Sequence, residues 1–466
     1  MNDGTELSDA ANVGMRFAEL AAKVEFDHLP GKAVEAAKKT LLDSLGVMLA
    51  ASGTEPSVRP VVDLVREGAG REEASVLGFG FKVPATSAAF ANGAMSHSLN
   101  YDDYLPWGQH CSLSLVPTVL AVTEYKQGVS GKDLIAAVAV GQDIFTRLRC
   151  NVDWKKDWNV STVLGVFEAA GRVLGLSAHQ INQAFAIASG EASGVMDVVS
   201  GAGSELGAIY GAFPARGATT AALLAAKGVV GVDTVFESKT GVFDTYFNGE
   251  YDRAAMLADL GVDYQGSTTL YKPWPAIGTA HSHIHATIGL VTDHELDVAD
   301  IAELRVFVGD AHEILCVPPE IRKAPSTLLE ARFGLPFLVA LAAAKRSLSA
   351  TALTIEALND PQVLDLARKV VAIRDPDLDW KFELPNGIVE IVMGDGRKYV
   401  RVGENTPGSA DAPMTWNELG QKFKECAAAA AIPVPGEGAR RAQDLIANLE
   451  LIDDAADVLE SVSGEL

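Results

Sequence analysis

Apolar side chains recur at helical spacing through most of the first 270 residues of this 466-residue chain. The apolar face of residues 33–52 consists of Ala37, Leu41, Leu45 and Met48. The same spacing predicts helices over residues 131–148, 178–196 and 217–227. Ala and Gly dominate these segments, and small side chains let helix backbones approach closely. We therefore expect a tight, mostly buried bundle, with a loop at the Gly-rich residues 200–211.

The pattern changes to a mixture of strands and helices between about residues 271 and 404. Residues 302–310 alternate apolar and polar positions, as a half-buried strand does. Residues 324–346 predict a helix that starts with a capping-box pattern, and residues 387–402 predict a hairpin with an Asp-Gly turn. This segment therefore predicts a separate α+β domain, and the chain after residue 415 is helical again.

The length of the chain also predicts more than one domain. A chain of 466 residues is too long for one compact core, so two or three domains are expected. Turn-forming residues flank the α+β segment at residues 268–272 and 404–408. We expect the chain to leave and re-enter the helical domain at these two hinges.

Composition and charge narrow the range of partners. Apolar residues make up 48% and charged residues 21%, an ordinary globular mixture. The 38 basic and 61 acidic residues give a formal charge of −23. Phosphate backbones and anionic membranes repel such a chain, so we expect neither nucleic acid nor a membrane as partner. An anionic substrate would require the few cationic residues to gather in its site.

The cysteines and the N-terminus indicate a cytoplasmic protein. The four cysteines are far apart and form no metal-binding or disulfide pattern, as expected of thiols in a reducing compartment. The first ten residues are acidic and polar, unlike a signal or transit peptide. No apolar run reaches the roughly 18 residues that a membrane span requires.

One candidate site lies at the end of a predicted helix, in the stretch ANGAMSHSLNYDDY. His97 is carried into the apolar end of this helix, and Asn100, Asp102 and Asp103 follow together. The two acids suit general bases, metal ligands, or capping and loop hydrogen bonds. His110 follows in a loop containing Pro and Gly, and loops on rigid helices are where ligand contacts concentrate.

A second candidate site is the run HSHIH, which contains His281, His283 and His285. On a strand, the three imidazoles would share a face and suggest a metal-dependent hydrolase. On a helix, which the following residues favour, His283 points away from the other two. His281 would then lie in the first helical turn, where free N–H groups favour an anionic ligand. The alternative for each is an ordinary core or surface histidine.

Motifs for the commonest cofactors are absent from the sequence. There is no P-loop, no nucleophile elbow and no strand-borne dinucleotide fingerprint. We therefore expect no nucleotide and no nicotinamide cofactor.

Several motifs, in order over nearly the whole chain, resemble those of the MmgE/PrpD family. The matching residues are Asn92, Gly93, His97 and Leu99 before NYDD; Lys272, Trp274, Pro275 and His281; EARFGLPFLVA at 330–340; and NTPGSADAPMTWNELGQKF at 405–423. The resemblance implies a mainly α fold: a large all-helical domain of residues 1–270 and 405–466, with residues 271–404 inserted as a smaller α+β lid.

The resemblance also implies an activity. It implies a homodimer that requires no metal and no organic cofactor, with its site in the cleft between the domains. Such a site moves a proton next to a carboxylate of a small di- or tricarboxylate. Water or carbon dioxide is then lost, or a centre is inverted.

The family's site residues are only partly kept in this sequence. The kept histidines are His110 and His281, for which the resemblance implies catalytic roles. The changed positions are Asn100 in place of an acid, Asn159 in place of a His, Gly207 in place of a Lys and Tyr210 in place of a His. Each lost charge-assisted contact is worth roughly 1.5–3 kcal/mol, so a citrate-like trianion should bind poorly. Either the substrate has fewer carboxylates, or Lys272 and Arg216 substitute as cations.

We therefore predict a cofactor-independent, dehydratase-like lyase that acts on a small carboxylic acid other than 2-methylcitrate and cis-aconitate. The predicted catalytic residues are His110, His281 and Tyr210, the last as a proton donor. The predicted substrate-binding residues are His97, Asn100, Asp102, Tyr104, Asn159 and Lys272. The alternatives are an epimerase or decarboxylase of the same family, the metal-dependent hydrolase, and an inactive homologue that binds a metabolite or partner.

Overall fold

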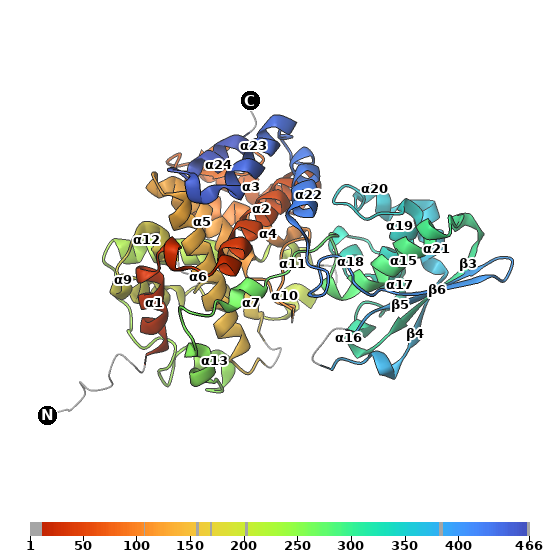
Figure 1. The fold of residues 1–466 in the computed structure, drawn as a ribbon, viewed down its shortest axis with the longest axis horizontal. Coiled ribbons are helices and arrows are strands. Elements are labelled where there is room, and N and C mark those ends of the chain that lie inside the picture. The colour runs from red at the N-terminus through yellow and green to blue at the C-terminus, as the bar shows by residue number, and fades with distance from the viewer. Residues whose placement is uncertain are drawn as a thin grey trace.

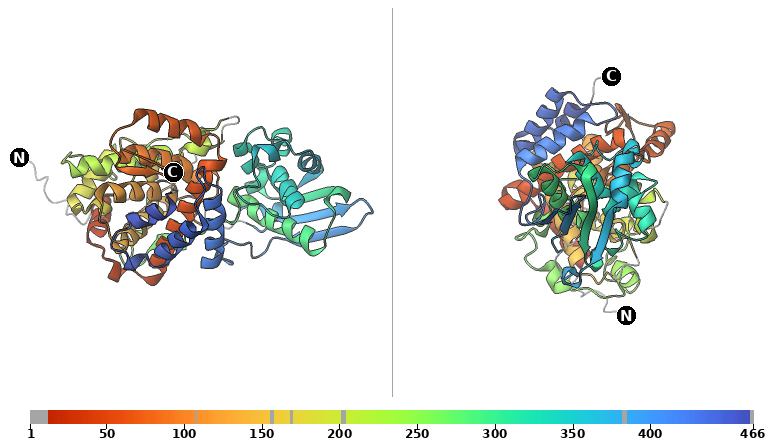
Figure 2. Two further views of the ribbon diagram at one scale, coloured as in Figure 1. Left: turned by 90° about the horizontal axis from the view of Figure 1, so that it is seen from above. Right: turned by 90° about the vertical axis from the view of Figure 1, so that its right-hand side faces the viewer.

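A computed structural model describes residues 12–106, 108–154, 158–167, 170–200, 204–381 and 385–463. The chain folds into two lobes, a larger helical lobe and a smaller lobe with a sheet (Figure 1). Figure 2 shows the same two lobes from above and from the side of the sheet. The prediction of a mainly α protein is confirmed. Among the described residues, no helix combines the length and apolar character needed to cross a membrane.

The helical lobe is built from both ends of the chain. Its N-terminal helices are α1 (Val13–Lys23), α2 (Gly31–Thr54), α3 (Val58–Gly68), α4 (Ala85–Ser98), α5 (Ser112–Lys126), α6 (Gly131–Cys150), α7 (Val160–Gly165), α8 (Ala170–Leu174), α9 (Ala178–Ala188), α10 (Asp197–Ser200), α11 (Leu206–Ile209), α12 (Ala212–Ala226), α13 (Val242–Phe247) and α14 (Arg253–Leu257). Its C-terminal helices are α22 (Trp416–Ala428), α23 (Gly436–Ala447) and α24 (Ala456–Val462). A short hairpin, β1 (Ala74–Val76) and β2 (Phe81–Val83), precedes α4.

Small residues let these helices pack closely, as the composition predicts. A Cβ added at Gly46 of α2 would lie 3.1 Å from the Phe423 ring of α22. A Cβ at Gly93 of α4 would lie 2.7 Å from the carbonyl oxygen of Gly211, at the start of α12. The last helices therefore pack directly on the first ones, and α4, which carries His97, is fixed between its neighbours.

The smaller lobe is an α+β unit with a four-stranded sheet. Its helices are α15 (His281–Asp293), α16 (Asp310–Glu313), α17 (Pro319–Lys323), α18 (Leu328–Arg332), α19 (Leu335–Lys345), α20 (Ile355–Leu358) and α21 (Pro361–Arg368). Its strands are β3 (Ile301–Val308), β4 (Val370–Arg374), β5 (Ile388–Met393) and β6 (Lys398–Val402), in the order β4-β3-β5-β6. β3 and β4 pair in parallel, whereas β5 pairs antiparallel with both β3 and β6.

Three of the predicted segments differ in the structure. The helix expected over residues 178–196 ends at Ala188, just before the sequence SGEASG. The helix expected over residues 324–346 is two helices, α18 and α19, because Gly334 and Pro336 start a new helix. The loop expected over residues 200–211 includes the short helix α11, and residues 201–203 lie outside the described part.

Each lobe has its own hydrophobic core. One core joins residues from Val13 to Tyr271 with residues from Met414 to Val462 and takes in Ala350 of the smaller lobe, and the other runs from Ala276 to Met393. Movement of the smaller lobe as a lid, about residues 268–272 and 404–408, stays a prediction.

Candidate functional site

The last turn of α4 places the signature residues beside one another. The Asn100 N–H donates to the His97 carbonyl at 2.8 Å, and Asn100 has a left-handed φ of 50°. Asn tolerates this conformation better than most residues, so it suits a sharp turn at a helix end. The turn brings the Asp102 side chain back toward the His97 ring.

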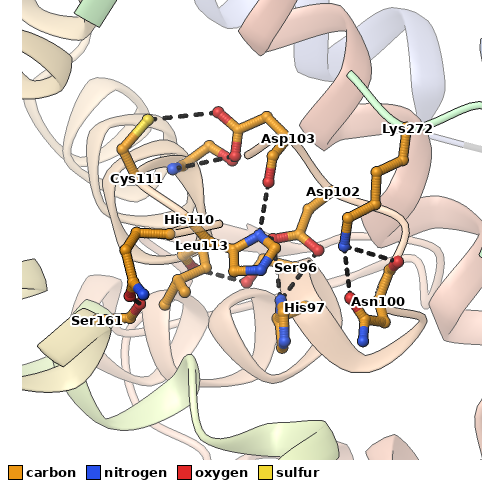
Figure 3. A network of polar contacts seen from close by, with 12 residues as sticks. Ser96, His97, Asn100, Asp102, Asp103, His110, Cys111, Leu113, Ser161 and Lys272 are labelled. Carbon is orange, nitrogen blue, oxygen red and sulfur yellow. Dashed lines mark hydrogen bonds and ion pairs between the residues drawn. The ribbon is translucent and has the colours of Figure 1, made fainter. Parts of the chain in front are cut away.

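Asp102 is the centre of a buried cluster with two histidines (Figure 3). The Nδ1 atom of His97 lies 2.9 Å from both carboxylate oxygens, and the Nδ1 atom of His110 lies 3.0 Å from Oδ2. The two imidazole centroids are 4.5 Å apart. We call His97, Asp102 and His110 the imidazole–carboxylate cluster.

The neighbours of His110 fix which of its nitrogens carries a proton. Its Nδ1 atom lies 2.6 Å from the carbonyl oxygen of Asp103 as well as 3.0 Å from Asp102. Both neighbours only accept hydrogen bonds, so Nδ1 is the protonated nitrogen. In the neutral ring, Nε2 is then left with a free lone pair, which is the state that a general base requires.

Asp103 holds the loop that ends at His110. Its carboxylate accepts hydrogen bonds from the Ser112 hydroxyl and backbone N–H at the start of α5, and from the Cys111 thiol at 3.4 Å. Burial, and secondly the charge of Asp102, raise the pKa of Asp103 to about 6. Asp103 therefore makes the capping and loop contacts that were one of the sequence alternatives.

Burial and charge act in opposite directions within the cluster. Burial alone would raise the pKa of Asp102, but His110, His97 and Lys272 outweigh it and hold that pKa well below its usual value. Burial lowers the pKa of His97 to about 4, although Asp102 opposes this shift. At neutral pH the cluster is therefore an ionised carboxylate that accepts hydrogen bonds from two imidazole rings.

Lys272 lies against Asn100, on the same turn. Its ammonium donates to the Asn100 backbone oxygen at 2.9 Å and to the Asn100 side-chain oxygen. The side chain is almost fully buried, and this burial lowers the pKa of Lys272 to about 8 even though Asp102 favours the charged form. Where the family motif has an acid, the lysine meets a neutral amide.

Tyr210 packs against the cluster from the end of α11. Its ring centroid lies 4.9 Å from that of His97. Burial, and secondly the charge of Asp102, raise the pKa of Tyr210, so its hydroxyl stays protonated at neutral pH. The structure thus brings Tyr210 together with His97, and a protonated phenol is a potential proton donor.

His281 is the first residue of α15, so the predicted helix start is confirmed. Its Nε2 donates to the Ala276 carbonyl at 3.1 Å, and its ring packs edge-on against Trp274. Burial, and secondly the charge of Lys272, lower the pKa of His281 to about 3. His281 is therefore neutral at neutral pH, with its protonated nitrogen already engaged.

The other two histidines of the HSHIH run do not join His281 at a common point. His283 donates to the Phe307 carbonyl at 2.8 Å and packs against His312, whereas half-buried His285 lies beside Trp274. The helix separates His283 from its neighbours, so this run does not form the metal site of the hydrolase alternative. The predicted separation of His110 and His281, within about 10 Å across a small acid, stays a prediction.

Asn159 is connected to the His110 loop through one residue. It caps α7, and its side-chain oxygen accepts from the Ser161 N–H at 3.2 Å. The Ser161 hydroxyl donates to Gln109, the residue before His110, at 3.3 Å. The amide nitrogen of Asn159 is buried, and among the described residues it has no hydrogen-bond partner. It is therefore a spare neutral donor near the cluster.

Tyr104 and Arg216, also considered from the sequence, contact other parts of the protein. The Tyr104 hydroxyl donates to the Gly408 carbonyl at 2.9 Å, and Tyr104 forms an isolated bridge with Leu270. It thus ties together the two segments between the lobes. Arg216, considered as a substitute cation, is exposed and lies over the Phe90 ring, 4.8 Å from its centroid.

The imidazole–carboxylate cluster is also the group, within the described ranges, whose donor atoms converge closely enough to hold a metal ion. Its contacts of 2.9–3.0 Å are ordinary hydrogen-bond lengths. A metal would have to displace the Nδ1 protons that both rings direct at Asp102. We therefore interpret the cluster as hydrogen-bonded, and the expectation of no metal stays a prediction.

Two buried cations near the site were missed as site residues. Lys422 of α22 contacts the backbone of Tyr101 and Lys272, and Arg332 of α18 donates to Glu55 at 2.6 Å and to the Ser98 carbonyl at 2.8 Å. Both residues lie in stretches that resemble motifs of the MmgE/PrpD family, so the sequence did contain a signal for them. Periodicity could not show that these distant segments meet at α4.

Comparison with known proteins supports the resemblance. The model of the MmgE/PrpD N-terminal domain matches residues 15–254, and that of the C-terminal domain matches residues 274–451. The chain is 24% identical to the cis-aconitate decarboxylase-like protein oryM of Aspergillus oryzae, over 99% of each chain. It is 25% identical to cis-aconitate decarboxylase of Mus musculus over 88% of this chain and 85% of the relative. It is 26% identical to cis-aconitate decarboxylase of Aspergillus terreus over 94% of each chain.

Proposed function

Because the chain belongs to the MmgE/PrpD family, we propose that it is a cofactor-independent lyase that acts on a small carboxylic acid by proton transfer. The observation that supports this proposal most directly is the hydrogen bonding of His110 at Nδ1. Its Nδ1 proton is held by the Asp103 carbonyl and by Asp102, which leaves Nε2 as the basic nitrogen of the ring. Positioned bases of this kind contribute about 10²–10⁴-fold to a rate.

The proposed reaction is a dehydration. His110 Nε2 removes a proton from the carbon next to a substrate carboxylate, and that electron pair forms the new double bond. The hydroxyl on the neighbouring carbon leaves as water after taking the Tyr210 phenol proton. The proton on His110 then returns to the Tyr210 oxygen through solvent. Asp102 stabilises the imidazolium that forms on His110 during the reaction.

His281 is proposed as a second acid–base group on the other lobe. Its Nε2 proton is donated to Ala276, so it offers Nδ1 as an acceptor. With a pKa lowered to about 3 it enters the reaction neutral, so it has no imidazolium proton to supply. This division of roles favours Tyr210 over His281 as the donor.

The proposed substrate has fewer carboxylates than citrate. Lys422 is paired with Asp43, and Arg216 lies over Phe90, which leaves Lys272 as the cation beside Asn100. One such cation and the neutral donor of Asn159 suit a mono- or dicarboxylate. Turnover of 2-methylcitrate or cis-aconitate should be negligible, far below the typical enzyme rate of about 10 s⁻¹.

Decarboxylation is the second candidate, because the relatives compared above are named cis-aconitate decarboxylases or decarboxylase-like. Loss of carbon dioxide would leave an electron pair on carbon that a protonated group must quench, a role open to Tyr210. Epimerisation would use the same proton abstraction. An inactive homologue remains the alternative from another class, motivated by Gly207 and Asn159.

Proton exchange tests the proposal before the substrate is known. The chain is incubated in deuterated water with a panel of hydroxy and unsaturated mono-, di- and tricarboxylates, and deuterium at the carbon next to the carboxylate is measured by NMR. We expect exchange with at least one mono- or dicarboxylate, lowered at least about 10²-fold in His110→Gln. His179→Gln, an exposed histidine on α9, is the matched control. Exchange that survives His110→Gln would refute the assignment of the base.

We further propose that the chain acts as a homodimer, on the basis of the family resemblance. Light scattering at micromolar concentration should report twice the mass of 49.1 kDa. A monomer at that concentration would refute this part of the proposal.

A further inference from the structure

Lys422 of α22 is a buried lysine that uses its whole ammonium group within the protein. Its Nζ donates to Asp43 Oδ1 at 2.7 Å, to the Tyr101 carbonyl at 2.7 Å and to the Lys272 carbonyl at 2.9 Å. It also lies 3.7 Å from the centroid of the Tyr101 ring. An ammonium has three protons to donate, so these bonds occupy all of them.

The two carbonyl groups belong to the segments that build the candidate site. Tyr101 lies between Asn100 and Asp102, and Lys272 lies on the segment that leads to α15. Asn100 and Lys272 are 172 residues apart in the chain, and the Lys272 amine contacts Asn100 where the two segments meet. A single ammonium from the C-terminal part of the chain therefore holds both sides of this contact.

We propose that Lys422 is a positioning residue of the site. This inference goes beyond the proposed function but rests on it, because the proposed function is what gives Lys272 its role in binding the substrate. The Lys422 ammonium fixes the main chain at Tyr101 and Lys272, so that the Lys272 amine stays against Asn100. It also places a like charge near that amine. Lys422 therefore acts on the site through Lys272 and has no direct role in the chemistry.

The charges around Lys272 are consistent with this role. Asp102, Asp103 and Asp43 favour its protonated form, whereas burial and Lys422 disfavour it. Its neighbours His281 and His97 are neutral at neutral pH. The charge of Lys422 thus opposes the protonation of Lys272, and its removal should leave the amine more strongly protonated.

The test measures the protonation of Lys272 directly and needs no substrate. The chain is labelled with ¹³C at the lysine ε-carbon and titrated by NMR, with the Lys272 signal assigned from Lys272→Arg. In the unmodified chain we expect a pKa of about 8. In Lys422→Gln, which keeps hydrogen-bond donors but removes the charge, we expect an upward shift on the order of one unit. Lys422→Arg keeps the charge and should restore the original value.

Lys38 provides a matched control. Like Lys422, it is a buried lysine that joins α2 to the C-terminal part of the chain, through Glu450 at 2.6 Å. Lys38→Gln should change the thermal stability without moving the Lys272 titration. An unshifted Lys272 in folded Lys422→Gln, or an equal shift in Lys38→Gln, would overturn the proposal. If Lys422→Gln fails to fold, the double variant Lys422→Gln/Asp43→Asn is used, because it also removes the Asp43 carboxylate that Lys422→Gln leaves unpaired. In that variant a smaller upward shift of the Lys272 pKa is expected.

The outcome is separable from the proposed function. A chain without exchange activity but with a shifted Lys272 titration would contradict the lyase proposal and support the role of Lys422. A chain with exchange activity but an unshifted Lys272 titration would support the lyase proposal and contradict the role of Lys422.

Discussion

The two lobes bury polar groups in different ways. In the helical lobe, buried charges meet opposite charges or donors: Asp102 lies between two imidazoles, Lys422 pairs with Asp43, and Arg147 pairs with Asp143. In the smaller lobe, the buried histidines His281 and His283 are neutral and donate to backbone carbonyls. The helical lobe therefore pairs its buried charges within itself, whereas Arg332, a buried cation of the smaller lobe, pairs with Glu55 of the helical lobe.

This difference suggests a division of labour in the proposed reaction. A paired carboxylate such as Asp102 can stabilise positive charge as it develops on His110, which suits the step in which a proton is removed. A neutral imidazole such as His281 can approach an anionic substrate without a charge of its own. Substitutions at Asp102 and His281 test whether the two lobes differ in this way.

The largest expected effect is that of removing the charge of the cluster. In Asp102→Asn, one carboxylate oxygen becomes an NH2 donor that faces the Nδ1–H groups of the two imidazoles, so that contact becomes repulsive unless one imidazole changes its tautomer. We expect kcat for exchange or turnover to fall by about 10²–10⁴-fold. The control is Asp143→Asn, a buried and paired acid of the same lobe, which should lower stability but leave kcat unchanged. Equal kinetic losses in the two variants would contradict a special role for the cluster.

The next effect concerns the neutral imidazole of the smaller lobe. His281→Gln keeps a donor for the Ala276 carbonyl but removes the basic nitrogen, so kcat should fall at least about 10²-fold with the fold intact. His285→Gln, one helical turn further along α15, should have little effect. Full activity of His281→Gln on the true substrate would remove His281 from the mechanism.

The sequence predicted which residues form the candidate site better than it predicted how those residues are arranged. Helical periodicity located α2 and α6, and the Asp-Gly turn located the β5–β6 hairpin, because these signals are local. The break before α19 depended on Gly334 and Pro336, whose local signal was overlooked within a longer apolar pattern.

The cluster itself could be predicted only in part. His97, Asp102 and His110 lie within fourteen positions, so their proximity is nearly local. That Asp102 contacts both rings, while Asp103 caps the next helix, depends on the left-handed turn at Asn100. The contacts of Lys422 and Arg332 depend on packing between distant segments, which one sequence does not encode in any short pattern.

The third effect concerns stability in acid. Burial lowers the pKa of His281 and of His283 to about 3, whereas an unfolded histidine titrates near 6.5. Below pH 6.5 the unfolded state therefore binds more protons, and stability falls as pH drops toward the folded pKa. From pH 7 to pH 5 each ring should cost on the order of 2 kcal/mol in free energy of unfolding.

Hydrogen exchange resolved by peptide measures this acid effect lobe by lobe. Protection in α15 and β3 should fall between pH 7 and pH 5 by more than protection in α2 and α6. His283→Gln keeps a donor for the Phe307 carbonyl but does not titrate, so it should reduce the pH dependence of the smaller lobe. Equal loss of protection in both lobes would contradict the comparison.

The smallest effect concerns Lys272, on the segment between the two lobes. Lys272 is a buried lysine whose side-chain partner, Asn100, is neutral. Asn100→Asp would replace that amide with a carboxylate at the same contact, and Asp tolerates the left-handed turn almost as well as Asn. The new charge should raise the pKa of Lys272 above its value of about 8, by about one unit or more. The ¹³C titration measures this shift, and Asn100→Ser is the neutral control.

The same substitution should also change how the site holds an anion. In Asn100→Asp the new carboxylate would neutralise the charge of Lys272, so less of that charge is available to a substrate. Binding of a monocarboxylate should therefore weaken about tenfold, the factor that one pKa unit represents. A variant whose Lys272 titrates unchanged would mean that the amide at Asn100 does not set the charge available to the substrate.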